Sequence, residues 1–386
     1  MLPILRPLMV ATSVLFMATA TAAETSFDLL VGTYTQGKSE GIYRYRFDSA
    51  RGLIAAKPEQ LVVTGNPSWL ALSPDRTRLY AVNENGPGQT DTVGKASSFK
   101  VDPSTHVLDP LNEVETQGDE PTHASLSKDG RFLFVANYAV HPDPGGSAVV
   151  LGIDKDGSLL PVIQQERHPP SRVDVERQSG SHVHSVVSAP NGRYVYVSDL
   201  GADKVFIYRL DADNKAWPLG PAGPSEVRLP PGSGPRHLLF DAKGKYAYLT
   251  LEMTAQVAKF DYRSGGLDLK HLVDLDQKGG PKGAAGALHL SADGRFLYVS
   301  NRGAVNQLVV FAVDAQGDLR EIQRRSVEGD HPREFSLDPS GRFVLIADQK
   351  SNAIVVVQRD EKTGLLGKTV QTFAIDSPSA LVFLDK

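Results

Sequence analysis

A short motif recurs six times along the chain at a nearly constant interval. Each copy contains a tight turn, which ends in glycine in five copies, then a basic residue and a run of aromatic and aliphatic residues. The basic residues that open these runs are Arg78, Arg131, Arg193, Lys245, Arg295 and Arg342. Consecutive copies therefore lie 53, 62, 52, 50 and 47 residues apart, the differences between these numbers. This interval is typical of β-propeller blades, which have about 40–50 residues plus loop insertions.

Each copy has the residue pattern of paired β-strands. Glycine suits the tight turn of a hairpin because it tolerates a positive φ, and the residues after it favour strands. A further strand is expected downstream in each copy, for example over residues 147–153 and 307–313. One blade of this kind cannot bury both of its faces. The copies are therefore expected to stack around a common axis.

A seventh blade is divided between the two ends of the chain. Residues 27–35 and 41–47 have the pattern of its second and third strands. The tail Ser377–Phe383 echoes Asn66–Leu72, which is an expected innermost strand, so the tail is expected to supply the missing first strand. We therefore predict an all-β, seven-bladed propeller of four-stranded antiparallel blades, closed when the C-terminal strand joins the N-terminal blade. An eight-bladed ring or an open solenoid is the alternative.

The N-terminal residues have the pattern of a secretory signal peptide. Arg6 precedes an apolar stretch over residues 8–20, and Ala20-Thr21-Ala22-Ala23 resembles a cleavage site. We predict a signal peptide at 1–23, a single domain at 24–386 and a periplasmic location; an uncleaved anchor is the alternative. Cysteine is absent, which excludes disulfides and thiol nucleophiles. The net charge of −4 disfavours binding to nucleic acid or anionic lipid, and no membrane association is expected after cleavage.

Polar residues recur at fixed distances from the turns. Eight positions before the turn stand Ser68, Thr122, His184, Arg236, Gly286 and Arg333. Eight positions after it stand Glu84, Tyr138, Leu200, Glu252, Arg302 and Gln349. One position nearer the turn on that side stand Asn83, Asn137, Asp199, Leu251, Asn301 and Asp348. Because the two inner strands of a blade form a hairpin, these positions meet at one end of the ring near its axis.

This register places His184 beside Asp199 and Arg236 beside Glu252, while Arg302 comes from the next blade. A funnel lined by such side chains is expected to bind a small polar ligand. The alternative is that the charges only tie neighbouring blades together.

Several motifs resemble a known family across nearly the whole chain. They are Val31-Gly32-Thr33-Tyr34-Thr35, Asn66-Pro67-Ser68-Trp69-Leu70, Ser181-His182-Val183-His184-Ser185-Val186, Ser198-Asp199-Leu200-Gly201-Ala202-Asp203, Gly234-Pro235-Arg236-His237-Leu238, Ser300-Asn301-Arg302-Gly303 and Pro332-Arg333-Glu334-Phe335. The chain resembles the lactonase family of seven-bladed propellers, which includes bacterial 6-phosphogluconolactonases and the fungal carboxy-muconate lactonizing enzyme. The resemblance implies hydrolysis of a sugar lactone, with catalytic residues at His184, Arg236, Glu252 and Arg302.

Lactone hydrolysis needs a base for water and positive charge for the oxyanion. His184 is the expected base, oriented by Asp199, because histidine titrates near neutral pH. Glu252 is the rival base, although a neighbouring Arg236 would lower its pKa. Arg302 or Arg236 is expected to hold the oxyanion. The further residues expected to contact substrate are His182, His123, Arg333 and Asp199.

No cofactor and no metal are expected, and the sequence carries no signal for an oligomeric state. The metal alternative would use Asn83, Glu84, Asn137 and Asp199 as ligands in the funnel. Export favours unphosphorylated glucono-1,5-lactone as substrate, because phosphorylated sugars are cytoplasmic; 6-phosphogluconolactone is the alternative. Lactone formation and a non-catalytic binding platform are the other readings of the same fold.

Overall fold

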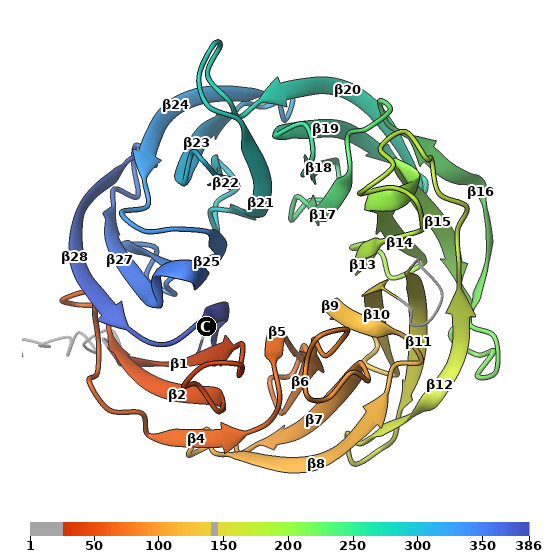
Figure 1. The fold of residues 1–386 in the computed structure, drawn as a ribbon, viewed down its shortest axis with the longest axis horizontal. Coiled ribbons are helices and arrows are strands. Elements are labelled where there is room, and N and C mark those ends of the chain that lie inside the picture. The colour runs from red at the N-terminus through yellow and green to blue at the C-terminus, as the bar shows by residue number, and fades with distance from the viewer. Residues whose placement is uncertain (1–25, 140–145, 386) are drawn as a thin grey trace, which may run out of the picture.

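Seven antiparallel sheets stand around a central axis in the computed structural model (Figure 1). The structure describes residues 26–139 and 146–385. The predicted seven-bladed propeller is confirmed, and six of the seven sheets have four strands. In the first blade the outermost strand is divided into two short strands that both pair with β2. The predicted signal peptide lies outside the described residues. Within them, no helix is long and apolar enough to cross a membrane.

Each blade is a meander of strands from the axis to the rim. The innermost strands are β29 (Pro378–Phe383), β5 (Pro67–Leu72), β9 (Asp119–Leu126), β13 (Val183–Ser188), β17 (Pro235–Phe240), β21 (Gly283–Leu290) and β25 (Pro332–Leu337). The second strands are β1 (Ser26–Thr33), β6 (Arg78–Asn83), β10 (Phe132–Ala139), β14 (Tyr194–Asp199), β18 (Tyr246–Leu251), β22 (Phe296–Gly303) and β26 (Phe343–Asp348).

The outer half of each blade completes the sheet. The third strands are β2 (Gly41–Asp48), β7 (Lys95–Val101), β11 (Ser147–Ile153), β15 (Lys204–Leu210), β19 (Gln256–Arg263), β23 (Gln307–Val313) and β27 (Ala353–Arg359). The outermost strands are β3 (Leu53–Ile54) with β4 (Gln60–Val63), then β8 (Leu108–Glu115), β12 (Leu159–Glu166), β16 (Leu219–Arg228), β20 (Gly266–Asp274), β24 (Leu319–Ser326) and β28 (Leu366–Ala374). Two 3-10 turns, η1 (Leu200–Ala202) and η2 (Gln349–Ser351), follow β14 and β26.

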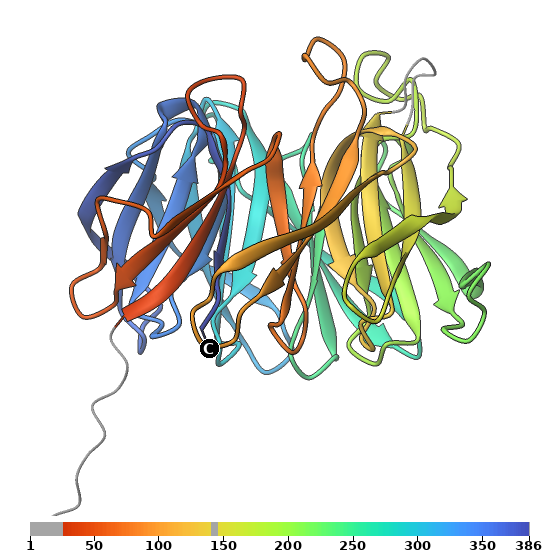
Figure 2. The ribbon, with the colours of Figure 1, turned by 90° about the horizontal axis from the view of Figure 1, so that it is seen from below.

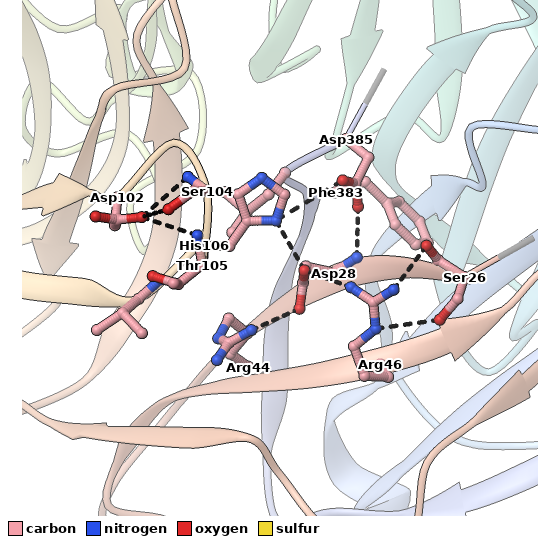
Figure 3. A network of polar contacts seen from close by, with 12 residues as sticks. Ser26, Asp28, Arg44, Arg46, Asp102, Ser104, Thr105, His106, Phe383 and Asp385 are labelled. Carbon is pink, nitrogen blue, oxygen red and sulfur yellow. Dashed lines mark hydrogen bonds and ion pairs between the residues drawn. The ribbon is translucent and has the colours of Figure 1, made fainter. Parts of the chain in front are cut away.

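The C-terminal strand closes the ring, as the repeat predicted. β29 pairs antiparallel with β1, with Leu30 opposite Val382 and Val31 opposite Leu381. A buried polar network reinforces this closure (Figure 3). Asp28 of β1 accepts hydrogen bonds from Arg44 at 2.8 Å and Arg46 at 2.6 Å.

His106 joins the same network from the loop between β7 and β8. Its Nδ1 lies 2.8 Å from Asp28 and 3.7 Å from Asp385, which follows β29 (Figure 3). Asp28, His106 and Asp385 are spaced closely enough to share a metal ion. However, the two guanidinium groups already neutralise Asp28, so the network is built as a polar clamp between the first two blades and the C-terminus.

Aromatic residues of the repeat motif tie neighbouring blades together. In four blades a buried tyrosine of the second strand donates to a glycine carbonyl in the outer hairpin of the next blade, at 2.7 to 3.1 Å; the pairs are Tyr80 with Gly157, Tyr196 with Gly265, Tyr248 with Gly317 and Tyr298 with Gly364. Apolar side chains fill the remaining space between blades, for example Tyr196 of β14 with Leu249 of β18. The motif therefore recurs because each of these blades makes the same contact with the next blade.

A β-bulge recurs at the same end of every inner hairpin. The ladder skips one or two residues there in all seven blades. The skipped positions include Ser379, Ser68, Thr122, His184, Arg236, Gly286 and Arg333. A bulge re-aims the side chain that it leaves unpaired, and bulges are frequent beside active sites. The polar positions of the sequence are thus bulges at one end of the propeller, and the turns of the inner hairpins lie at the other end. Figure 2 shows the propeller from the side, with loops at both ends of the blades.

Candidate active site

Glu252, the first residue after β18, is the centre of a buried charge cluster. Arg302 of β22 donates to its Oε2 at 2.7 Å, and the Nε of Arg236 lies 3.2 Å from the same oxygen. The Nε2 of His184 lies 3.9 Å away. Burial raises the pKa of Glu252, but Arg302, His184 and Arg236 outweigh it and hold that pKa well below its usual range. Glu252 is therefore an anion at neutral pH and a poor base.

Arg177 covers this cluster from the solvent side. It lies in the segment between β12 and β13, and its Nη2 donates to Glu252 Oε1 at 2.8 Å and to the Tyr138 hydroxyl at 3.2 Å. Its side chain is 44% exposed, so it is the outermost cation of the cluster. Arg177 was not among the predicted site residues, because it lies in an insertion outside the repeat register.

His184 is nearly surrounded by protein. Burial and the charge of Arg236 lower its pKa well below the usual value, although Glu252 acts in the opposite direction. Its imidazole packs edge-on against Tyr138 and His237, with ring centres 5.6 and 5.2 Å apart. The imidazole is therefore neutral at pH 7, and it becomes an effective base only when a group such as Glu252 stabilises its protonated form.

The expected pairing of His184 with Asp199 is wrong. The Asp199 carboxylate accepts from the Ser181 hydroxyl at 2.5 Å and from the backbone N–H of His182 at 2.9 Å. It also lies 3.1 Å from Nδ1 of His168. The reason is the bulge at His184, since the hairpin ladder pairs Asp199 with Val183 instead. Asp199 is fully buried and holds the chain that leads into β13.

Three polar atoms of the cluster have no hydrogen-bond partner among the described residues. They are Nδ1 of His184 and the Nε atoms of Arg236 and Arg302, all buried. The Nε of Arg236 is near Glu252 but is not directed for a hydrogen bond. Buried polar groups are normally satisfied, so unsatisfied groups in one place mark a site that expects a ligand. Two donors and one proton acceptor suit an oxygen-rich substrate.

A second ion pair lies on the same end of the channel. Arg333, in the bulge of β25, donates to both oxygens of Glu84 at 3.1 and 2.8 Å. The Tyr34 hydroxyl donates to Glu84 at 2.7 Å, and the Arg333 guanidinium lies 5.1 Å from the Tyr34 ring. These residues come from blades seven, two and one. The pair therefore bridges the ring closure and places a guanidinium beside the channel.

The two remaining expected substrate contacts lie in different places. His182 is half-buried, stacks on Tyr138 with ring centres 4.6 Å apart, and lies at the mouth with Arg177. His123 instead packs against Trp69 and His237, with ring centres 4.5 and 5.6 Å apart. His123 is one residue closer to the hairpin turn than the bulge at Thr122. It therefore lies between the Glu252 cluster and the turns at the opposite end.

The residues of the metal alternative each have other partners. Asn83 donates to Gly65 and Asn137 to Thr116, both carbonyls of the loop that enters the same blade, although Oδ1 of Asn137, the atom that would bind a metal, has no partner among the described residues. Glu84 accepts a hydrogen bond from Arg333, and Asp199 accepts one from the Ser181 hydroxyl. The four side chains therefore fix loops and ion pairs where they stand.

Comparison with known proteins agrees with this architecture. The family described as "Lactonase, 7-bladed beta-propeller" matches residues 28–383. The chain belongs to this family and is a lactonase, as the resemblance implied. A 6-phosphogluconolactonase of Formosa agariphila is 33% identical over 92% of this chain and 98% of its own length. The 6-phosphogluconolactonase of Bacillus subtilis is 32% identical over 92% and 97%.

Solved structures extend the comparison. The periplasmic gluconolactonase PpgL of Pseudomonas aeruginosa is 53% identical, with a TM-score of 0.90 over 93% of this chain and 99% of that one. A putative 6-phosphogluconolactonase of Bacteroides fragilis is 35% identical, with a TM-score of 0.85 over 95% and 99%. These relatives support lactone hydrolysis as the reaction.

Proposed function

We propose that the chain hydrolyses an unphosphorylated aldonolactone, glucono-1,5-lactone, in the periplasm at the Glu252 cluster. The observation that carries this proposal is the set of unsatisfied buried atoms on His184, Arg236 and Arg302 around one carboxylate. A small-molecule lactone supplies the carbonyl and hydroxyl oxygens that such a set would bind.

His184 acts as the general base in this proposal. Its neutral ring takes a proton from a water molecule as the water oxygen attacks the carbonyl carbon of the lactone. Glu252, 3.9 Å from Nε2, then stabilises the imidazolium, which is the role first expected of Asp199. When the tetrahedral intermediate collapses, the C–O bond of the ring breaks and the imidazolium returns its proton to the leaving oxygen. The products are the hydroxy acid, ionised at neutral pH, and a regenerated neutral His184.

Arg236 and Arg302 stabilise the charge on the carbonyl oxygen. Each has a buried Nε–H without an acceptor, and both guanidinium groups are oriented by Glu252 before substrate arrives. Donors that are fixed in advance lower the barrier because they need no reorganisation in the transition state, a contribution of about 3–4 kcal/mol in well-studied cases. His182 and Arg333 contact the hydroxyl groups of the substrate nearer the mouth.

The choice of the unphosphorylated substrate rests on location and likeness. The expected signal peptide would send the domain 24–386 to the periplasm, and the 53% identical PpgL is described as a periplasmic gluconolactonase. The second candidate is 6-phosphogluconolactone, favoured by the curated relatives and by Arg177 and Arg333 at the mouth, which could bind a phosphate.

The test follows acid release by the mature protein from glucono-1,5-lactone and from its 6-phosphate, with and without a chelator. We expect faster turnover of the unphosphorylated lactone, independent of chelator. His184→Gln should lower kcat by about 10²-fold or more, the usual contribution of a general base. His182→Gln is the matched control and should mainly raise KM. Unchanged turnover in His184→Gln would refute the mechanism, and preference for the phosphate would transfer the proposal to the second substrate.

A further inference from the structure

A cavity lies at the end of the channel opposite the Glu252 cluster. It has a volume of about 560 Å³ and reaches from a layer of three packed histidines, His123, His184 and His237, to the hairpin turns at Pro74 and Ser127. This volume is within the range of small-molecule sites, about 300–1,000 Å³. Neither the catalytic arrangement nor the substrate contacts proposed above use this space.

Two buried imidazoles lie at its inner end. His123 and His237 are each 6% exposed, and their ring centres are 5.6 Å apart. Burial and the charge of Arg236 lower the pKa of His123 to about 3 and hold that of His237 well below its usual value. Both rings are therefore neutral at pH 7, and each carries one N–H donor and one acceptor nitrogen.

The hydrogen bonds fix which nitrogen carries the proton. The Nδ1 of His237 lies 3.0 Å from Nη1 of Arg236, and a guanidinium can only donate, so this nitrogen accepts. The backbone N–H of Val186 donates to Nδ1 of His123 at 3.4 Å. Both Nε2 atoms are therefore N–H donors. Since Nδ1 of His237 is turned to Arg236 and the Glu252 cluster, its Nε2 is turned away from them.

The donor of His237 has no hydrogen-bond partner in the described part of the chain. It is buried and belongs to a side chain that lines the cavity, so an acceptor placed there would satisfy it. His237 thus accepts from Arg236 through Nδ1 and has its Nε2–H donor free on the side of the cavity.

The walls of the cavity are flat and mostly apolar. Trp69 stands beside both imidazoles, with ring centres 4.5 Å from His123 and 5.2 Å from His237. Leu72, Leu126 and Leu288 are among the aliphatic residues around it. Such walls suit an aromatic ring and leave the many hydroxyl groups of a sugar without partners.

The charged groups of the cavity disfavour an ionised ligand. Lys128 and Glu334 both line it. The exposed Lys128 ammonium already donates to the Pro190 carbonyl at 3.0 Å. Glu334, in contrast, is a buried carboxylate, which repels an anion, and its Oε1 accepts from His289 Nε2 at 2.7 Å. A cation would face the imidazole N–H donors at the inner end, and the carboxylate of the wall is already paired with His289. An uncharged molecule avoids both costs.

We propose that this cavity is a second binding site, which takes a small uncharged aromatic molecule whose oxygen acceptor, such as a carbonyl, binds Nε2–H of His237. The ring lies against Trp69 and the aliphatic wall. The site does not depend on lactone hydrolysis, since it lies on the far side of the histidine layer from Glu252.

Trp69 provides the measurement. The chain has two tryptophans, and Trp217 is 56% exposed on the outer part of the ring. Mature protein labelled with ¹⁵N-tryptophan therefore gives two indole N–H signals, and Trp217→Phe identifies that of Trp69. We expect acetophenone to shift the Trp69 signal in a saturable way and leave Trp217 unchanged. Cumene, which has the same shape without the oxygen, and benzoate, its anionic analogue, should bind at least tenfold more weakly.

Two variants separate binding at His237 from general effects. His237→Phe keeps the ring but removes the donor, and it should weaken acetophenone at least tenfold while leaving cumene unchanged. Val187→Phe narrows the cavity without touching the Glu252 cluster, and it should abolish the shift while lactone turnover persists. The proposal is overturned if acetophenone leaves Trp69 unshifted, if cumene or benzoate binds equally well, or if a folded Val187→Phe binds acetophenone as the parent does.

Discussion

Arg302 donates to Glu252 over 2.7 Å, although the two residues belong to neighbouring blades. Arg236 shares a blade with Glu252, and His184 comes from the blade before it. The carboxylate is therefore positioned by three separate sheets. The proposed site therefore depends on the order in which these three blades stack.

Glu252→Gln tests this central carboxylate. The substitution keeps the shape but removes the charge that stabilises a protonated His184, so we expect kcat to fall about 10²-fold. Glu84→Gln is the matched control, because Glu84 also accepts from an arginine at the same end of the channel. Its effect should be mainly on KM. Steady-state kinetics with glucono-1,5-lactone would contradict the assignment if both variants lost kcat equally.

Arg177→Gln tests the insertion that covers the site. Arg177 contacts Glu252 from the solvent side and is partly exposed, so its loss should raise KM several-fold and leave the fold intact. Arg172→Gln, in the same insertion, is the control and should change neither constant. Equal kinetics for Arg177→Gln and the parent protein would show that the insertion does not act at the site.

Acid should destabilise the protein below about pH 6.5. Burial lowers the pKa of His123 and His331 to about 3 and holds those of His184 and His237 far below normal. The unfolded chain binds protons at these histidines near pH 6.5 and the folded chain does not, so the free energy of unfolding falls as pH falls. Each histidine contributes up to about 1.4 kcal/mol per pH unit.

Urea unfolding at pH 7, 6 and 5 measures this slope. His123→Phe should reduce it, because one buried titrating ring is removed. His271→Gln, at a side chain that is 58% exposed, is the surface control. A slope that His123→Phe does not alter would disprove the linkage.

Asp348→Asn should stabilise the protein at alkaline pH. Burial, with Asp330 and Glu328 nearby, raises the pKa of Asp348 to about 8, and neither of its oxygens has a hydrogen-bond partner within the described residues. The unfolded chain releases this proton near pH 4, so the carboxyl group costs stability as pH rises from 4 towards 8. Asn83, Asn137 and Asn301 occupy the same position in other blades and donate through Nδ2.

Thermal unfolding at pH 4 and pH 8 checks this prediction. The variant should gain at most about 5 kcal/mol at pH 8, the free energy of a shift of about four pKa units, and little at pH 4, where the carboxyl group is protonated in the folded chain and about half protonated in the unfolded chain. Asp199→Asn, at the same repeat position but with its carboxylate fully used, is the contrast and should destabilise. A gain that is equal at both pH values would point to a cause other than ionisation.

The repeat predicted the blades, the closure and the pairing of Arg236 with Glu252, because hairpin register follows from turn position alone. It could not predict which way a bulged residue turns. Counting along an ideal ladder therefore placed Asp199 beside His184, whereas the bulge pairs Asp199 with Val183. Arg177 was not predicted as a site residue for a different reason. It lies in an insertion, where no register relates it to the other blades. The repeat thus predicts the neighbours of a site residue where the strands pair regularly. It does not predict them at a bulge or in an insertion.

Asp28→Asn tests the polar clamp at the ring closure. Asp28 has a side chain only 3% exposed and neutralises Arg44 and Arg46, so the substitution leaves two guanidinium groups without their carboxylate. Breaking such a buried pair costs about 3–5 kcal/mol, and the loss should appear as a lower unfolding midpoint in urea. Asp102→Asn, in the exposed turn that carries His106, is the control and should cost far less. Because the clamp joins β1 and β2 to the C-terminus, Asp28→Asn should also speed proteolysis of the last strand, and equal cleavage in both variants would show that β29 is held by its strand pairing alone.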